Sequence, residues 1–306
     1  MKMKVNVVLV TYNRKNLLIE ALDAVLNQTY TINKIFCIDN FSTDGTQDYL
    51  NEKGFLKRDN FIYIRTHNNL GGAGGFKLGV KEALLDKPDY IWLMDDDVEP
   101  EPTCLENLLS VSNEYGCVSQ PVRYYSDGEF ASFESKLFNF KNPFRDFKVG
   151  KISLEEIREG RILDICAVPF EGPLIPYEVI LKVGEIDDSY FIIGDDTDYS
   201  KRIIDSGYKI KLVNSANLIR KLKINPGTDF NWKTYFYFRN ITLLDKKFSS
   251  LWVLWLRIIY RFFRFSFSNV LYRRNINAYR VLISGLWAGI MNNKNNDVAT
   301  VKKRYG

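Results

Sequence analysis

The chain has 306 residues, of which 46% are hydrophobic and 26% are charged, and it carries a formal net charge of +5 at pH 7. This composition is typical of a folded globular protein and excludes a mainly disordered chain. The length allows a sizeable core, and it fits one compact unit with an appendage better than two full-sized domains.

Short apolar runs alternate with helical patterns over the first hundred residues. We expect strands at residues 5–10, 34–39, 61–66 and 90–95. The intervening segments have helical spacing, and one of these helices is expected to be capped by Ser42 or Thr43 and to close at Gly54. The alternation predicts an α/β fold with a mostly parallel sheet flanked by helices. Ligands of such sheets bind at the carboxyl ends of the strands, where the chain reads TYNR, DN, NNLGGAGG and DDD.

The run DYIWLMDDD ends a buried strand with three carboxylates. Residues two apart on an extended chain face the same way, so Asp95 and Asp97 can converge while Asp96 points aside. Two oxygen ligands at this spacing suit Mg²⁺ or Mn²⁺ that is also held by substrate phosphates. A solvated acidic turn, or an N-cap cluster for the following helix, is the alternative.

Two further motifs have a functional and a structural interpretation. The glycines of NNLGGAGGF allow a nucleotide or a sugar to approach the backbone closely, but they also fit a flexible loop before a helix. In GDDTDYSKR, Asp196 near a helix start can face a cleft, or the acidic residues can simply complement the helix dipole. Asp198 and Arg202 are four residues apart, which favours a surface ion pair.

The C-terminal region is aromatic and basic. No Asp or Glu occurs from Lys246 to Asn296, whereas nine cationic residues do, including Arg273 and Arg274. Arg257, Arg261 and Arg264 share one helical face among aromatic residues, as in an interfacial amphipathic helix. A helix that docks on the main domain with its basic side in solvent explains the pattern equally well.

Taken in order, VVLVTYNR, IDNFSTDGT, NNLGGAGG, WLMDDDVEP, GPLIP and FIIGDDTDYSKR resemble the inverting family 2 glycosyltransferases. The galactofuranosyltransferase-like and rhamnosyltransferase-like branches are the most similar. The resemblance implies the Rossmann-like GT-A fold, with residues 1–120 as the nucleotide-sugar-binding half and 121–229 as the acceptor-binding half. Residues 230–306 would form a C-terminal basic, aromatic helical appendage.

The resemblance also implies roles for individual residues. Asp95 and Asp97 would bind Mg²⁺ or Mn²⁺, Asp196 would be the catalytic base, and Asp195 would help to orient the acceptor. The galactofuranosyl branch uses a later histidine on the metal, but this chain has no histidine after His67. The nucleotide sugar would be bound by Thr11, Tyr12, Arg14, Asp39, Asn69, Gly71, Gly72, Gly74, Gly75, Asp95 and Asp96.

The expected activity is metal-dependent, inverting transfer of a hexosyl group, such as galactofuranose or rhamnose, from a UDP-linked or dTDP-linked donor. The acceptor would be a cell-surface glycan or a lipid-linked oligosaccharide, reached by a peripheral membrane protein, with or without homo-oligomer formation. The cysteines show no metal-site spacing and the first residues lack a signal peptide's apolar core, so we expect the cytoplasmic face of the membrane. Alternatives are a sugar nucleotidyltransferase, a nucleic-acid-binding protein using the basic tail, and an inactive sugar-nucleotide-binding scaffold. The acidic clusters argue against nucleic acid as a partner.

Overall fold

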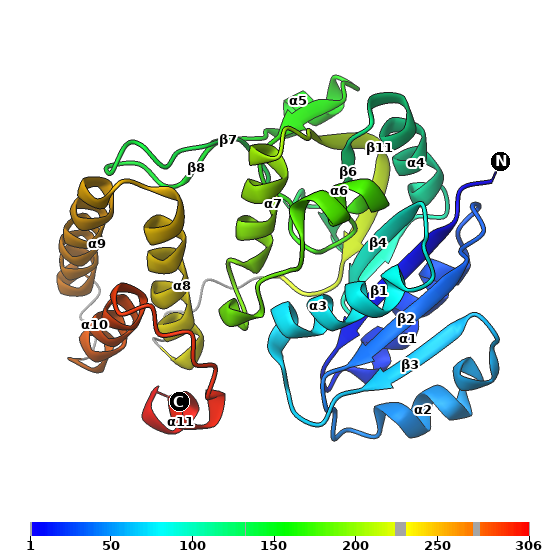
Figure 1. The fold of residues 1–306 in the computed structure, drawn as a ribbon, viewed down its shortest axis with the longest axis horizontal. Helices are drawn as coiled ribbons and strands as arrows, with labels where there is room; N and C mark the ends of the chain where they lie inside the picture. Colours follow the sequence, from blue (N-terminus) through cyan, green and yellow to red (C-terminus); the bar gives the residue numbers. More distant parts are fainter. Residues whose placement is uncertain (1, 132, 224–230, 272–275, 306) are drawn as a thin grey trace.

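The structure is a computed structural model that describes residues 2–131, 133–223, 231–271 and 276–305. A large sheet lies between helices, and a separate group of C-terminal helices stands beside it (Figure 1). The first half is the predicted parallel unit, in which strands pair in the order β3-β2-β1-β4. Its elements are β1 (Val5–Thr11), α1 (Lys15–Leu26), β2 (Lys34–Asp39), α2 (Thr46–Glu52), β3 (Phe61–Arg65), α3 (Gly71–Leu84) and β4 (Tyr90–Asp95).

The second half extends this sheet on the β4 side. Strand β10 pairs antiparallel with β4, and β6, β11 and β5 follow, with β9 also paired to β11. Within the described residues the sheet is therefore mixed, with four parallel and four antiparallel pairings. The elements are β5 (Val98–Pro100), α4 (Cys104–Tyr115), β6 (Val118–Tyr125), the hairpin β7 (Ser135–Phe138) and β8 (Lys148–Lys151), α5 (Leu154–Arg158), β9 (Leu163–Ile165), β10 (Leu174–Pro176), α6 (Tyr177–Val183), α7 (Asp195–Asp205) and β11 (Ile210–Arg220).

The core lies on both faces of the sheet. Along β1, Val7 and Leu9 belong to the cluster that includes α1, whereas Val8 and Val10 belong to the cluster that includes α3. Every residue of β1 is buried, as expected for a strand covered by helices on both sides. The polar ends of the strands are therefore the parts left to form a site.

Two local predictions were wrong, and one alternative for the triple aspartate is excluded. Helix α2 begins at Thr46 after a left-handed Gly45, and Ser42 instead accepts a hydrogen bond from the Asn13 backbone N–H at 2.8 Å. The glycines expected in a loop form the first turns of α3, which begins at Gly71. The triple aspartate is not an N-cap cluster, because β5 follows it before α4 begins.

The predicted helical tail is confirmed for the described residues. It consists of α8 (Trp232–Phe248), α9 (Leu251–Leu271), α10 (Ile276–Ile290) and α11 (Val298–Tyr305), with α8 between α7 and the other helices (Figure 1). The boundary expected at residues 229–230, together with Arg273 and Arg274, lies outside the described residues. In the described part of the chain, no helix combines the length and apolarity needed to cross a membrane.

We predict that Gly79→Ala destabilises the protein, because α3 lies directly on the sheet there. A Cβ at residue 79 would meet a Val8 methyl carbon at 2.3 Å, and such overpacking costs about 1–3 kcal/mol. Gly72→Ala is the matched control in the same helix, since a Cβ there has no atom within 4 Å. Urea unfolding of the ligand-free protein measures both, and equal stabilities for the two variants would contradict the proposed contact.

Candidate functional site

The carboxyl ends of β1 and β4 meet at Asp96. Its carboxylate accepts a hydrogen bond from the Thr11 hydroxyl at 2.8 Å and one from Arg14 Nη1 at 2.9 Å, and the Tyr12 backbone N–H lies at 3.4 Å. The structure thus brings together Thr11, Tyr12, Arg14 and the triple aspartate. Asp96 is thus bound to the end of β1, and the same Arg14 Nη1 also lies 3.8 Å from Asp97.

Asp97 and Asp95 are left with less compensation. Asp97 has Arg14 Nη1 at 3.8 Å, and its buried Oδ1 has no hydrogen-bond partner among the described residues. Burial, followed by the charges of Glu171 and Asp96, raises the pKa of Asp97 to about 6. Burial and the neighbouring Asp97 and Asp96 raise the pKa of Asp95 well above its usual value. Both carboxylates therefore sit where an added cation would be stabilised.

A buried ion-pair network borders the triple aspartate. Arg123, which is fully buried, donates to Glu134 at 2.7 Å and to Glu171 at 2.5 Å, and Arg220 lies 3.4 Å from Glu171. Arg220 also acts favourably on the charge of Asp97. These residues carry no recognisable signal in the sequence, because they come from separate strands and loops and form no local motif.

The residues present fit a divalent cation bound partly by substrate. The guanidinium groups that face this region belong to Arg14, Arg123 and Arg220. When all groups are ionised, they leave two negative charges unbalanced among the carboxylates of Asp95, Asp96, Asp97, Glu134 and Glu171. No group of three or more Asp, Glu, His or Cys side chains in the described part of the chain could hold a metal unaided. Mg²⁺ commonly takes only one or two protein carboxylates and completes its shell with water and phosphates.

The carboxyl end of β2 forms another part of this edge. Asp39 is buried and accepts from the Ser42 backbone N–H at 2.8 Å and from the Tyr63 hydroxyl at 2.5 Å. Beside it, Phe41 is 40% exposed with a left-handed φ of 68°. Arg65 stacks on the Phe41 ring at 4.9 Å. Phe41 was not singled out from sequence, although an exposed aromatic ring at a strand end offers a surface on which a base can stack.

The glycines of α3 have packing roles in addition to any role toward a ligand. A Cβ on Gly71 would lie 2.2 Å from the Phe191 carbonyl oxygen, and one on Gly75 would lie 2.6 Å from a Val10 methyl carbon. A Cβ on Gly74 would crowd Leu70 of the preceding turn. Gly72 has open space, so it is the glycine whose environment best suits close approach of a ligand. Asn69 fixes the helix start by accepting the Gly71 N–H at 2.8 Å.

The second acidic cluster begins α7. Burial and the neighbouring Asp196 raise the pKa of Asp195 to about 8. Asp196 is partly exposed, and its Oδ1 accepts from the backbone N–H and the hydroxyl of Thr197. The ion pair between Asp198 and Arg202 is present at 2.8 Å, but its surface placement was wrong because Asp198 is fully buried. Asp198 also pairs with Lys247 of α8 at 2.5 Å.

The two acidic clusters border the same segments. The Ala73 backbone N–H at the start of α3 donates to the Phe191 carbonyl, just before Asp195. In α7, the Ser200 hydroxyl accepts a hydrogen bond from the Val168 backbone N–H. Four residues after Val168, the Gly172 N–H donates to the carbonyl of Leu93, which lies two residues before the triple aspartate. These contacts tie the start of α7 to the carboxyl end of β4.

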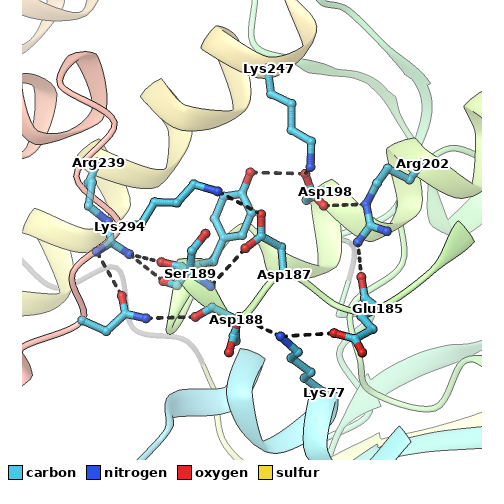
Figure 2. A network of polar contacts seen from close by, with 12 residues as sticks. Lys77, Glu185, Asp187, Asp188, Ser189, Asp198, Arg202, Arg239, Lys247 and Lys294 are labelled. Carbon is cyan, nitrogen blue, oxygen red and sulfur yellow. Dashed lines mark hydrogen bonds and ion pairs between the residues drawn. The ribbon is translucent and has the colours of Figure 1, made fainter. Parts of the chain in front are cut away.

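Helix α8 holds the segment that precedes Asp195 (Figure 2). Arg239 donates to the carbonyl oxygens of Ser189 and Tyr190 at 2.8 and 3.0 Å. The Asn240 amide donates to the carbonyls of Tyr190, Ile192 and Ile193 at 2.8, 2.6 and 2.7 Å. The C-terminal helices are thus part of the frame of the site.

We predict that the ligand-free protein loses stability as pH rises. In the unfolded chain an Asp titrates near 3.9, whereas the folded Asp97 and Asp195 retain protons up to about pH 6 and 8. From about pH 4 up to these values, the folded state therefore binds more protons than the unfolded chain. The free energy of unfolding falls as pH increases through this window. Asp97→Asn should flatten the fall between pH 4 and 6 and stabilise the protein at pH 7.5 by on the order of 2 kcal/mol.

Thermal unfolding with a chelator present, from pH 4.5 to 8.5, measures this effect. The exposed-site variant Asp59→Asn is the control and should keep the wild-type profile. A profile of Asp97→Asn that parallels the wild type would show that Asp97 ionises as readily in the folded protein as in the unfolded chain.

Comparisons with known proteins identify the family of this chain. A sequence model described as Glycosyl transferase family 2 matches residues 6–164, more than half of the chain. Galactofuranosyltransferase GlfT1 of Mycolicibacterium smegmatis is 31% identical over 209 residues, covering 65% of this chain and 65% of the relative. Glycosyltransferase GlyG of Streptococcus pneumoniae is 28% identical over 158 residues, covering 50% of this chain and 48% of the relative. The chain thus spans just under two thirds of the length of GlfT1.

The fold is also similar to a solved structure. The crystal structure of GalNAc-T7 with UDP, GalNAc and Mn²⁺ superposes with a TM-score of 0.61 and 17% identity, over 79% of this chain and 48% of that chain. At this identity the likeness concerns the fold alone, which confirms the predicted GT-A architecture. With the family match across the β1–β4 unit and beyond, the chain belongs to glycosyl transferase family 2.

Proposed function

We propose that this protein is a metal-dependent, inverting glycosyltransferase that moves a hexosyl group from a nucleotide diphosphate to a glycan acceptor. The observation that carries the proposal is the incompletely compensated pair of carboxylates at Asp95 and Asp97, linked through shared segments to a second acidic cluster at Asp195 and Asp196. One cluster suits a cation and a diphosphate, and the other suits a proton acceptor.

The donor would lie along the carboxyl ends of β1, β2 and β4. Asp39 and the exposed rings of Tyr12 and Phe41 would contact a uracil or thymine base, and Arg14 would face the diphosphate. Gly72 and Asn69 would border the sugar. The donor would be UDP-linked or dTDP-linked and carry galactofuranose or rhamnose. Of these sugars, galactofuranose is supported by the name of a relative, galactofuranosyltransferase GlfT1.

The residues of this chain account for the chemistry of a single displacement. The acceptor hydroxyl oxygen attacks the anomeric carbon, the bond from that carbon to the diphosphate oxygen breaks, and the hydroxyl proton passes to Asp196. Because the raised pKa keeps Asp195 protonated at neutral pH, the pair does not carry two adjacent charges, and Asp195 can donate a hydrogen bond to the acceptor. Mg²⁺ or Mn²⁺ on Asp95 and Asp97 would neutralise the departing diphosphate.

The setting proposed for this reaction is the cytoplasmic face of the cell membrane, where a lipid-linked acceptor would be presented to a peripheral enzyme. The support is indirect: the C-terminal helices that hold the 189–193 segment are rich in aromatic and cationic residues.

We predict that Asp196→Asn abolishes transfer while donor binding stays near normal. The amide keeps the size and the Thr197 contact but cannot accept the proton, so a loss of 10²–10⁴-fold in turnover is expected. The assay uses UDP-galactofuranose or dTDP-rhamnose as the donor and an extracted lipid-linked acceptor, and it measures turnover as the nucleotide diphosphate that is released. Substantial residual turnover would refute the role of Asp196, and release of pyrophosphate would instead indicate a nucleotidyltransferase.

We also predict that Asp97→Ala removes the metal-dependent part of UDP binding. Calorimetric titration of UDP with and without Mn²⁺ should show the affinity gain from Mn²⁺ reduced by about tenfold or more. Glu99→Ala, two residues along in β5, is the matched control because the Glu99 carboxylate is already paired with Lys221 at 2.7 Å. If Asp97→Ala binds UDP with the same metal dependence as the wild type, Asp97 is not a ligand.

A further inference from the structure

Helices α9 and α10 present an uncovered apolar face. On α9 the exposed residues follow helical spacing, and α10 adds a second row beside them. Six large side chains on this face are each between 50% and 70% exposed, namely Trp252, Trp255, Phe263, Phe267, Ile283 and Trp287. A contiguous patch of this kind is uncommon on a monomeric soluble protein and marks an interaction surface.

The face is also hollowed. A groove of about 290 Å³ runs between α9 and α10 and is lined only by apolar side chains, including Ile259 and Phe262 on one wall and Ile283 and Trp287 on the other. Its shape and chemistry suit hydrocarbon.

Two of the three α9 arginines expected in solvent face the protein instead. Arg257 is buried and pairs with Asp245 of α8, and Arg261 Nη2 lies 2.6 Å from the other carboxylate oxygen of Asp245. Asp245 is the sole acid in the sequence between residues 231 and 271, and it attracts both. The outward side of α9 is the apolar one.

Cations remain around the apolar face. Arg280 is exposed and lies three residues before Ile283 and seven before Trp287, on the same side of α10, and Arg264 of α9 is exposed as well. The sequence from Lys246 to Asn296 contains no acid to balance them. Two copies meeting by this face would bring like charges together, whereas an anionic bilayer would complement both the apolar face and its cations.

We propose that the α9–α10 face docks on the surface of an anionic lipid bilayer, with its Trp and Phe side chains inserted at the level of the headgroups. Indole rings favour this interface, and apolar helix faces of this type insert about 5–10 Å. The inference deepens the proposed function by naming the surface that meets the membrane, and it rests on that function only for the idea that the acceptor is lipid-linked.

The docked face has a defined relation to the second acidic cluster. Helix α8 binds α9 through Asp245, and it binds the segment before Asp195 through Arg239 and Asn240. Figure 1 shows α8 between α9 and α7, and Figure 2 shows Arg239 beside Ser189. Docking by α9 and α10 would therefore hold Asp195 and Asp196 at a set height above the bilayer, where the head of a lipid-linked acceptor can reach them.

The test is flotation of the full chain with vesicles of phosphatidylcholine alone or with 30% phosphatidylglycerol. We expect the wild type to float with the anionic vesicles and less so at high salt. Trp255→Ser combined with Phe263→Ser should reduce the vesicle-bound fraction by about tenfold or more, because two interfacial aromatic anchors are lost. Arg280→Glu should reduce the preference for phosphatidylglycerol.

The double variant Leu85→Ser with Leu181→Ser is the matched control, because both leucines are at least 60% exposed on the main domain. It should float like the wild type. Equal flotation of the Trp255/Phe263 variant, no flotation of the wild type, or a wild-type dimer in solution that this variant dissociates would each overturn the proposal. Metal-dependent UDP binding measured on the same samples reports on the proposed function separately, and the surface variants should leave it unchanged.

Discussion

The amide of Asn240 holds the segment on which the second acidic cluster depends. That segment is strained, since Phe191 and Ile193 have φ values of 62° and 64°, which cost of order 1–3 kcal/mol each. Three carbonyls of the segment accept from one buried amide, so the strain is held by contacts that a free loop would lack. Gly194, which is also left-handed, follows the segment, and α7 then begins with Asp195 and Asp196 in its first turn.

Charge balance explains how the first cluster can stay folded. The charges of Arg14 and Arg220 stabilise the ionised form of Asp97, and Arg123 forms ion pairs with both Glu134 and Glu171. This compensation is incomplete, and the remaining cost appears as raised pKa values for Asp95 and Asp97. A fully neutral network would gain little from a metal, whereas an uncompensated one gains stability when cation and diphosphate arrive together.

Most features of the fold that depend on residues close together in the sequence were predicted correctly. The strands β1 to β4, the polar residues at their ends and the helical tail follow from hydrophobic periodicity, which is strong in this chain. The network of Arg123, Glu171 and Arg220 could not be predicted, because it is assembled from residues about fifty positions apart. Their meeting depends on the parallel pairing of β6 with β11 and the antiparallel pairing of β10 with β6. The tail arginines were misplaced for a related reason: periodicity identifies a face but not what covers it.

Helix α8 carries an unusual set of buried polar side chains, and their directions explain why the tail is part of the enzyme. Arg239 and Asn240 face the strained segment, while Asp245 faces the arginines of α9. A buried charge or amide whose partner moves away is left unsatisfied, at a cost of several kcal/mol for a charge. Displacing α9 or the 189–193 segment would therefore leave polar groups of α8 unsatisfied, so the apolar face and the segment before Asp195 are held in one arrangement.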